Sequence, residues 1–402
     1  MISWLSRAAP PPAGRSFSLA LIATFAAFSA LYAPQPLLPF FAEFYGVSPT
    51  RVALLITVTL IGLAIAPLGI GVWLQRYSAQ RLLVISTLLL GILQFVFASA
   101  PTFSILLAAR TAQSFLYPAI FTAAVTYCSK QGEREAIASR ISLYVATTIV
   151  GGLGGRLIGG YVSSWTHWTT TFQLLGVLLL LCSAGLFFAA RDASLPSENT
   201  DNTWTSAHKL ITDVTFLSGY LMIFLVFFSF VAILNALPFR MVEVNPGIDA
   251  SSISLLYLGY VIGIIIAVFI KPLTRLLGNE LRTLTVAVIV FMSGIALYTV
   301  NNIATMIAVG FLTCAGMFTI HTTLSGLLNS MKPESASLVN GLYISIYYTA
   351  GAFGSFLPVA LYHASGWNIF LLAVFGSCGL SLIPLAILKR NYKHVNNSLD
   401  NS

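Results

Sequence analysis

Two arginines, Arg110 and Arg156, lie inside long apolar stretches of this sequence. If such stretches cross a membrane, an arginine at the bilayer centre costs about 2.5–3.5 kcal/mol on insertion scales. Each arginine must therefore face water or polar partners, and two roles are open for each. It can bind a transported solute or perturb a titrating neighbour, or it can hold helices together through bonds to backbone carbonyls.

Other polar side chains occur in the same kind of stretch. His321 lies in the run Thr-Ile-His-Thr-Thr, and because histidine titrates near neutral pH it is a candidate proton carrier. The alternative is a histidine satisfied by neighbouring hydroxyls such as those of Thr319, Thr322 and Thr323. Amides are costly to leave unpaired in an apolar interior. The candidate amides for solute contact are Gln35, Gln94, Gln113 and Asn235.

The 12 acidic residues have the opposite distribution, because all of them fall at predicted helix ends, in loops or in tails. A pump that exchanges protons for cationic solutes is expected to need a carboxylate inside the membrane. This sequence offers arginines and a histidine there instead. It therefore predicts a preference for anionic or neutral solutes, with Arg110 and Arg156 in contact with them.

Enzyme chemistry has no support in the sequence. It contains no nucleotide-binding fingerprint and no cluster of metal ligands, so we expect no enzyme activity and no cofactor. Charged residues make up only 8% of the chain, far below the roughly 25% of soluble domains. The net charge of +8 is spread over short loops, which indicates membrane orientation and lipid headgroups as its partners, and no nucleic acid.

These residues are positioned by twelve apolar segments, most of them long enough to span a bilayer as helices. The predicted spans are 17–42, 50–74, 82–100, 103–127, 137–163, 168–190, 214–239, 250–270, 283–300, 303–328, 337–362 and 366–388. Most of the 20 Lys and Arg residues lie in alternate loops, which predicts that both termini are cytoplasmic. The sequence thus predicts an all-α, multi-pass protein of a bacterial inner membrane.

The spans form two related halves. Tyr144 and Gly155 match Tyr343 and Gly354 at a shift of 199, and further matches, such as Gly62 with Gly263, lie at a shift of 201. The near-constant shift predicts two pseudo-symmetric six-helix halves with a central solute site between them. The predicted parts are an N-terminal half (1–190), a flexible cytoplasmic linker (191–213), a C-terminal half (214–390) and a cytoplasmic tail (391–402).

A glycine series in the fifth predicted span favours close helix packing. The series is Gly151, Gly155, Gly159 and Gly160. It resembles the antiporter motif G-x-x-x-G-P-x-x-G-G of the major facilitator superfamily, with Arg156 in the place of proline. Two features resemble the YnfM-type inner-membrane transporters of the drug:proton antiporter branch. One is the arginine at this position, and the other is the run Tyr-Ala-Pro-Gln-Pro-Leu-Leu-Pro at residues 32–39.

Two further motifs resemble the same superfamily. Leu106, Arg110 and Gln113 resemble its l-x-x-x-R-x-x-q-G motif. The loop after the second predicted span is similar to its cytoplasmic gate loop through Gly71, Arg76 and Arg81, although Gln75 stands where the motif has aspartate.

The resemblance implies proton-coupled efflux of small molecules by alternating access, in which two halves rock about a central site. An exporter or importer of one metabolite, such as a sugar or organic acid, is an alternative. A non-transporting scaffold or receptor is another, but it would not need polar groups in its interior. Expected partners are a small-molecule solute, protons and the lipid bilayer, for a chain acting as a monomer.

Overall fold

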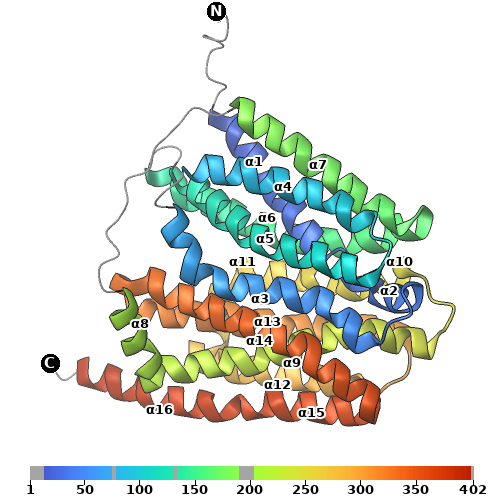
Figure 1. Ribbon diagram of the computed structural model, residues 1–402. Coiled ribbons are helices and arrows are strands. Elements are labelled where there is room, and N and C mark those ends of the chain that lie inside the picture. Colours follow the sequence, from blue (N-terminus) through green and yellow to red (C-terminus); the bar gives the residue numbers. More distant parts are fainter. Residues whose placement is uncertain (1–12, 75–77, 131–133, 190–202, 400–402) are drawn as a thin grey trace, which may run out of the picture.

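A computed structural model describes residues 13–74, 78–130, 134–189 and 203–399, and this part of the chain consists of helices joined by short connections (Figure 1). The first-half helices are α1 (Ala13–Tyr32), η1 (Gln35–Leu37), α2 (Leu38–Phe44), α3 (Pro49–Leu74), α4 (Ala79–Ala98), α5 (Phe103–Lys130), α6 (Arg134–Trp165) and α7 (Trp168–Ala189). The others are α8 (Thr203–Thr212), α9 (Val214–Val244), α10 (Ala250–Ser254), η2 (Leu255–Gly259), α11 (Tyr260–Leu277), α12 (Glu280–Leu297), α13 (Ile303–Met331), η3 (Pro333–Ser335), α14 (Ala336–Ser365), α15 (Trp367–Leu380) and α16 (Leu382–Leu399).

Ten segments of the described chain are long and apolar enough to cross a membrane, and the part of α3 from Pro49 to Ile65 is apolar as well. The remaining predicted span is α5, which is 28 residues long but carries Arg110 and several other polar residues. Together these account for the twelve predicted spans. The cost of Arg110 within α5 must therefore be offset by its neighbours.

The two halves pack against each other mainly along α3 and α14, which lie side by side at the junction in Figure 1. A second junction forms where α6 meets α10. The end of the bundle that carries α2 and α10 is called here the α2/α10 end. The opposite end carries α8 and the start of α1.

The pseudo-symmetry appears at the level of single glycines. A Cβ atom added to Gly155 in α6 would collide with the backbone of Ser29 in α1. A Cβ atom added to Gly354 in α14 would collide with the backbone of Phe228 in α9. Gly155 and Gly354 are 199 positions apart, and so are their contacts, Ser29 and Phe228. The same close helix pairing is thus built twice, once in each half.

The first span is interrupted where the sequence places Pro34 and Pro36. A proline provides no N–H to the preceding turn, and α1 ends at Tyr32, followed by η1 and α2. The repeat-related α9 runs on to Val244 although it contains Pro238. The interruption therefore distinguishes the two halves near the α2/α10 end.

The prediction of a flexible linker was wrong for its second part. Residues 203–212 form α8, with Ala207 and Leu210 buried, because apolar residues three apart share one face of a helix. The first part of the linker lies outside the described residues. So does Arg76 of the predicted gate loop, and of Gly71 only the helical backbone is described.

Candidate functional site

Arg110 is fully enclosed within the first half, with 0% of its surface exposed. Its guanidinium donates hydrogen bonds to three backbone carbonyls, those of Leu55 at 3.0 Å from Nε, Ala30 at 3.1 Å from Nη1, and Leu31 from Nη2. Nη1 also lies 3.0 Å from Gln113 Oε1 and 2.8 Å from the Tyr117 hydroxyl. All three nitrogens of this arginine therefore have acceptors within the first half.

The acceptors of Arg110 are explained by the break in α1. The carbonyl of Ala30 would normally accept a bond from residue 34, but Pro34 has no N–H. Leu31 lies in the last turn of α1, where carbonyls lack partners within the helix and a cation is favoured. Arg110 therefore stabilises the interrupted end of α1 and ties it to α3. This geometry favours the carbonyl-binding role for Arg110 over direct solute contact.

Arg156 has a different environment, although only 1% of it is exposed. Nε donates to Gln35 Oε1 at 2.7 Å, Nη1 donates to the Gly152 carbonyl at 2.9 Å, and Nη2 donates to the Tyr260 hydroxyl at 3.1 Å. Tyr260 belongs to the second half. Arg156 thus joins the two halves directly, at about 14 Å from the end of α6 along the helix axis.

Aromatic rings from both halves surround the Arg156 guanidinium. Its central carbon lies 4.0 Å from the ring centre of Tyr32, 4.4 Å from that of Tyr260 and 5.0 Å from that of Tyr257. Such contacts stabilise a desolvated cation. Three of its N–H groups have acceptors, so one on each terminal nitrogen has no protein acceptor in the described part of the chain. A guanidinium with free N–H groups can bind a carboxylate.

Arg156 begins a hydrogen-bonded series that crosses between the halves. Gln35, which accepts from Arg156, donates from Nε2 to Asn235 Oδ1 at 2.5 Å. Asn235 Nδ2 donates to the Ser355 carbonyl at 3.4 Å, and the Ser355 hydroxyl lies 2.7 Å from that of Thr57. We call Arg156, Tyr260, Gln35, Asn235, Ser355 and Thr57 the inter-half network.

The two amides of this network lie within one position of repeat equivalence, since Gln35 and Asn235 differ by 200 positions and Ser29 and Phe228 by 199. Equivalent residues of two halves meet where the pseudo-symmetry axis passes between them. Another bond joining the halves, from the Ser251 amide to the Ser164 hydroxyl at 3.0 Å, also lies toward the α2/α10 end. The halves are therefore closed together at that end in this structure.

A cluster of tyrosines adjoins Arg156. Tyr32 of the first half interacts electrostatically with Tyr260, Tyr347 and Tyr348 of the second, and Tyr144 of the first half interacts with Tyr348. Tyr32, Tyr260, Tyr347 and Tyr348 are all partly exposed although their helices belong to the bundle interior. Tyr347 stacks on Phe227 with ring centres 3.5 Å apart. Aromatic faces and hydroxyls therefore dominate the surroundings of Arg156.

His321 lies in α13 beside this cluster. Its Nδ1 is 3.0 Å from the Tyr343 hydroxyl, and its ring centre is 4.9 Å from that of Tyr347. The bonding partner is thus a tyrosine of α14 rather than one of the neighbouring threonines. His321 does not join the inter-half network, but Tyr347 connects it to the tyrosine cluster.

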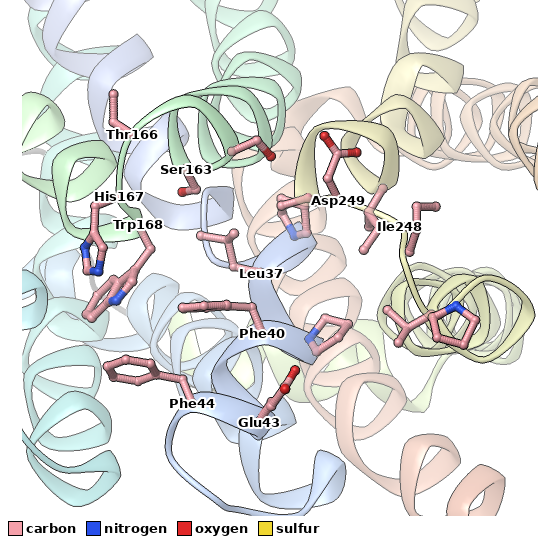
Figure 2. A pocket seen from close by; sticks show the side chains of 17 residues that line it. Leu37, Phe40, Glu43, Phe44, Ser163, Thr166, His167, Trp168, Ile248 and Asp249 are labelled. Carbon is pink, nitrogen blue, oxygen red and sulfur yellow. The ribbon is translucent and has the colours of Figure 1, made fainter.

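A cavity of about 550 Å³ opens between the halves at the α2/α10 end (Figure 2). Phe40, Phe44 and Trp168 line it on one side, and Asp249 faces it from the other half. Glu43 supplies a second carboxylate, and no lysine or arginine of the described chain lines this cavity. Pro36 and Leu37 also line it, so the cavity lies directly beyond Gln35 of the inter-half network.

The structure brings some predicted site residues together and separates others. Arg156, Gln35 and Asn235 meet in one network, whereas Arg110 and Gln113 form a group inside the first half. Among the side chains that the structure describes, Arg110 and Arg156 are the buried charged residues, and none is a carboxylate. Sequence reasoning missed the aromatic and hydroxyl partners. These are Tyr32, Tyr257, Tyr260, Thr57 and Ser355.

The structure describes the glycine series of α6 in full but only part of the predicted gate loop. Gly151, Gly155 and Gly159 approach the backbone of α1 and of the residue that follows it, while Gly160 approaches Ala250 and Ser254 of the second half. The series thus serves both packing within a half and closure between halves. Arg81 lies in α4, near its start, and most of the loop that precedes α4 is outside the described residues.

Comparison with known proteins gives one consistent result. The family model described as Major Facilitator Superfamily matches residues 20–355. The MFS-type transporter YybF of Bacillus subtilis is 26% identical over 85% of each chain. The inner membrane transport protein YnfM of Escherichia coli is 24% identical over 85% of this chain and 83% of its own length.

Solved structures show the same fold. A mutant of the nucleoside transporter NupG superposes with a TM-score of 0.78 at 11% identity, over 92% of this chain and 99% of NupG. A bacterial homologue of the human lysosomal transporter Spinster, in an inward-facing and occupied conformation, gives 0.74 at 14% identity over 95% of each chain. Identities this low support the fold alone.

Proposed function

The chain belongs to the major facilitator superfamily, and on that basis we propose that it exports small anionic or neutral solutes across a bacterial inner membrane in exchange for protons. The chain is a multi-pass membrane transporter and not an enzyme. The proposal rests chiefly on one observation. A single guanidinium, that of Arg156, lies between the two halves with two uncommitted N–H groups.

Alternating access explains why Arg156 sits within the inter-half network. A carboxylate that binds the free N–H groups of Arg156 would weaken the bonds from the same guanidinium to the Tyr260 hydroxyl and the Gln35 carbonyl, because it is the stronger acceptor. Loss of those bonds weakens the contact between the halves at the α2/α10 end. Since a ligand shifts a conformational equilibrium by its differential affinity for the two states, solute binding would favour opening of that end.

The distribution of basic residues supports an orientation of the bundle in the membrane. We propose that this end faces outside, because the Lys and Arg residues at it are Arg51 and Arg240, whereas basic residues gather at the other end. Those at the other end include Arg81, Lys209, Lys271, Arg275, Arg282, Lys332, Lys389 and Arg390.

His321 is the proposed proton carrier. An imidazole can accept a proton at one nitrogen while a hydroxyl holds the other, and Tyr343 provides that hydroxyl. The neighbouring Tyr347 places His321 near the solute region without direct contact with Arg156. Proton uptake and anion release would then alternate between two separate groups.

The test is solute flux in proteoliposomes with an imposed pH gradient. We expect flux in the direction opposite to proton movement, a loss of about tenfold or more in Arg156→Lys, and a weaker dependence on pH in His321→Gln. Flux along the proton gradient would identify an importer instead. Absence of gradient-driven flux for every solute tried would support a scaffold or receptor.

Orientation is tested separately. Cysteines introduced at Ser48 and Gly247 should react with a membrane-impermeant maleimide in intact cells, because both positions lie at the α2/α10 end. Cysteines at residues 195–205 should react only after lysis. The reverse pattern would invert the topology and with it the direction of transport.

A further inference from the structure

We propose that the solute bound at Arg156 is an aromatic monocarboxylate. This inference rests on the function proposed above and narrows it to one chemical class. It is carried by three features of the site. These are one buried cation, two uncommitted donors on that cation, and aromatic rings from both halves around it.

The number of charges limits the solute to one carboxylate. Arg156 is the buried charged residue at the junction of the halves, whereas Arg110 is bonded to five acceptors within the first half. A second carboxylate would be buried without a partner, which is costly in an apolar interior. A cationic solute would bring a like charge toward Arg156. A monoanion balances the charge of the site.

The shape of the donor favours a carboxylate. A guanidinium is planar and presents N–H groups in a fixed fork that matches the two oxygens of a carboxylate. In this structure Gly152 and Gln35 fix the plane of the Arg156 guanidinium. The Tyr260 hydroxyl occupies one N–H of Nη2. A carboxylate oxygen is the stronger acceptor and can replace this neutral hydroxyl.

The surroundings favour an aromatic body over an aliphatic one. Tyr32 and Tyr260 stack against Arg156 from opposite halves, at 4.0 and 4.4 Å. Tyr260 also meets Phe318 edge-on at 5.3 Å, and Tyr347 meets Tyr348 edge-on at 5.2 Å. Rings arranged in stacked and edge-on pairs bind another ring with preferred geometry, beyond the contribution of area alone.

A neutral polar solute is the main competitor, because tyrosine hydroxyls also hold alcohols and amides. Such a solute would leave the two free N–H groups of Arg156 with weaker acceptors. Hydrogen bonds that involve an ionised donor or acceptor are roughly twice as strong as those between neutral groups, and an ion pair is the most favourable case. The carboxylate therefore distinguishes the favoured solute from its neutral isostere.

Four probe molecules separate the contribution of the carboxylate charge to binding from that of the aromatic ring. We would measure how benzoate, benzamide, cyclohexanecarboxylate and terephthalate bind to the purified full-length protein, by isothermal titration at neutral pH. Benzoate is expected to bind most tightly. Benzamide and terephthalate should bind about tenfold more weakly or worse, because they lack the charge or add one. Cyclohexanecarboxylate should bind roughly three- to tenfold more weakly than benzoate, because it cannot make the stacking contacts of an aromatic ring.

Variants assign these differences to residues. Arg156→Gln should remove the difference between benzoate and benzamide. Tyr260→Leu should remove the difference between benzoate and cyclohexanecarboxylate, whereas Tyr260→Phe should retain it. Tyr161→Leu is the matched control, since this ring lies near the end of α6 against Trp165, away from Arg156. It should leave all four affinities unchanged.

Each outcome has one meaning. Equal binding of benzoate and benzamide would overturn recognition of the charge, and equal binding of benzoate and cyclohexanecarboxylate would overturn recognition of the ring. No binding of any probe would overturn the inference as a whole. If the protein moves other solutes against a proton gradient but no aromatic acid, the inference fails while the proposed function stands. If the protein transports no solute against a proton gradient, the proposed function is wrong, and the inference that rests on it fails as well.

Discussion

The two buried arginines of this protein have the same side chain, the same degree of burial and different consequences. Arg110 donates to five acceptors within the first half, of which three are backbone carbonyls, and one N–H of its Nη2 has no acceptor in the described part of the chain. Arg156 donates to three acceptors, contacts both halves and retains two N–H groups. Burial of a charge alone therefore does not indicate a binding site. The extent to which the protein itself uses the bonding capacity of that charge is the better guide.

The largest effect is expected when Arg110 is removed. In Arg110→Leu the carbonyls of Ala30 and Leu31 lose their donor, and each unpaired buried group costs roughly 1–3 kcal/mol. The Leu55 carbonyl loses only its second donor, because it lies inside α3. We expect a large drop in the melting temperature of the detergent-solubilised protein. Arg156→Gln should cost much less stability but abolish anion flux. An Arg110 variant with wild-type melting and no flux would instead assign Arg110 to solute binding.

The next effect concerns the glycines that seat α6, the helix that carries Arg156. Gly155→Val would force α6 away from Ser29, and overpacking of this kind costs typically about 1–3 kcal/mol or more. Gly354→Val should cost a similar amount at the repeat-related contact with Phe228. Gly376→Val is a suitable control, because a Cβ atom there meets nothing within 4 Å. Melting temperatures of the three variants would show whether the two halves pack alike.

A smaller effect is expected from Asn235→Ala, which removes the partner of Gln35 but leaves Arg156 in place. The equilibrium between the states closed and open at the α2/α10 end should shift by about 1 kcal/mol, roughly fivefold, toward the open state. Disulfide formation between cysteines introduced at Ser164 and Ser251 would report that state, since these residues are in contact. An unchanged disulfide yield would exclude the network as a determinant of closure.

The smallest expected effect is on the pH dependence of stability. It involves Asp249 at the α2/α10 end and neither arginine. Hydrogen bonds from Ser251 and Ser252 lower the pKa of Asp249 below its ordinary value of 3.8. A lowered pKa stabilises the fold above pH 3.8, and this stability is lost as pH falls through the folded-state pKa. Asp249→Asn should therefore show a smaller loss of melting temperature between about pH 5 and pH 3 than the wild type. Identical pH profiles would contradict this role.

Much of the fold follows from local features of the sequence. Apolar runs of bilayer length fix the spans, because every backbone polar group in lipid must be bonded within a helix. The matching positions of Gly155 and Gly354 follow from the repeat and need no other information. Pro34 and Pro36 likewise fix the break after α1, since neither can donate a backbone hydrogen bond. A buried arginine without a local carboxylate also shows, from sequence alone, that polar partners exist.

Only the tertiary structure decided which partners those are. The acceptors of Arg110 lie 79, 80 and 55 residues away on α1 and α3, and Tyr260 lies 104 residues from Arg156. No periodicity within one helix specifies contacts between helices, because these depend on how each helix is rotated against its neighbours. The sequence left the same two roles open for both arginines, whereas the packing encloses Arg110 within the first half and leaves Arg156 between the halves. The sequence determined that two cations are buried, and the packing of α6 against α1 and η2 decided which one meets both halves with donors to spare.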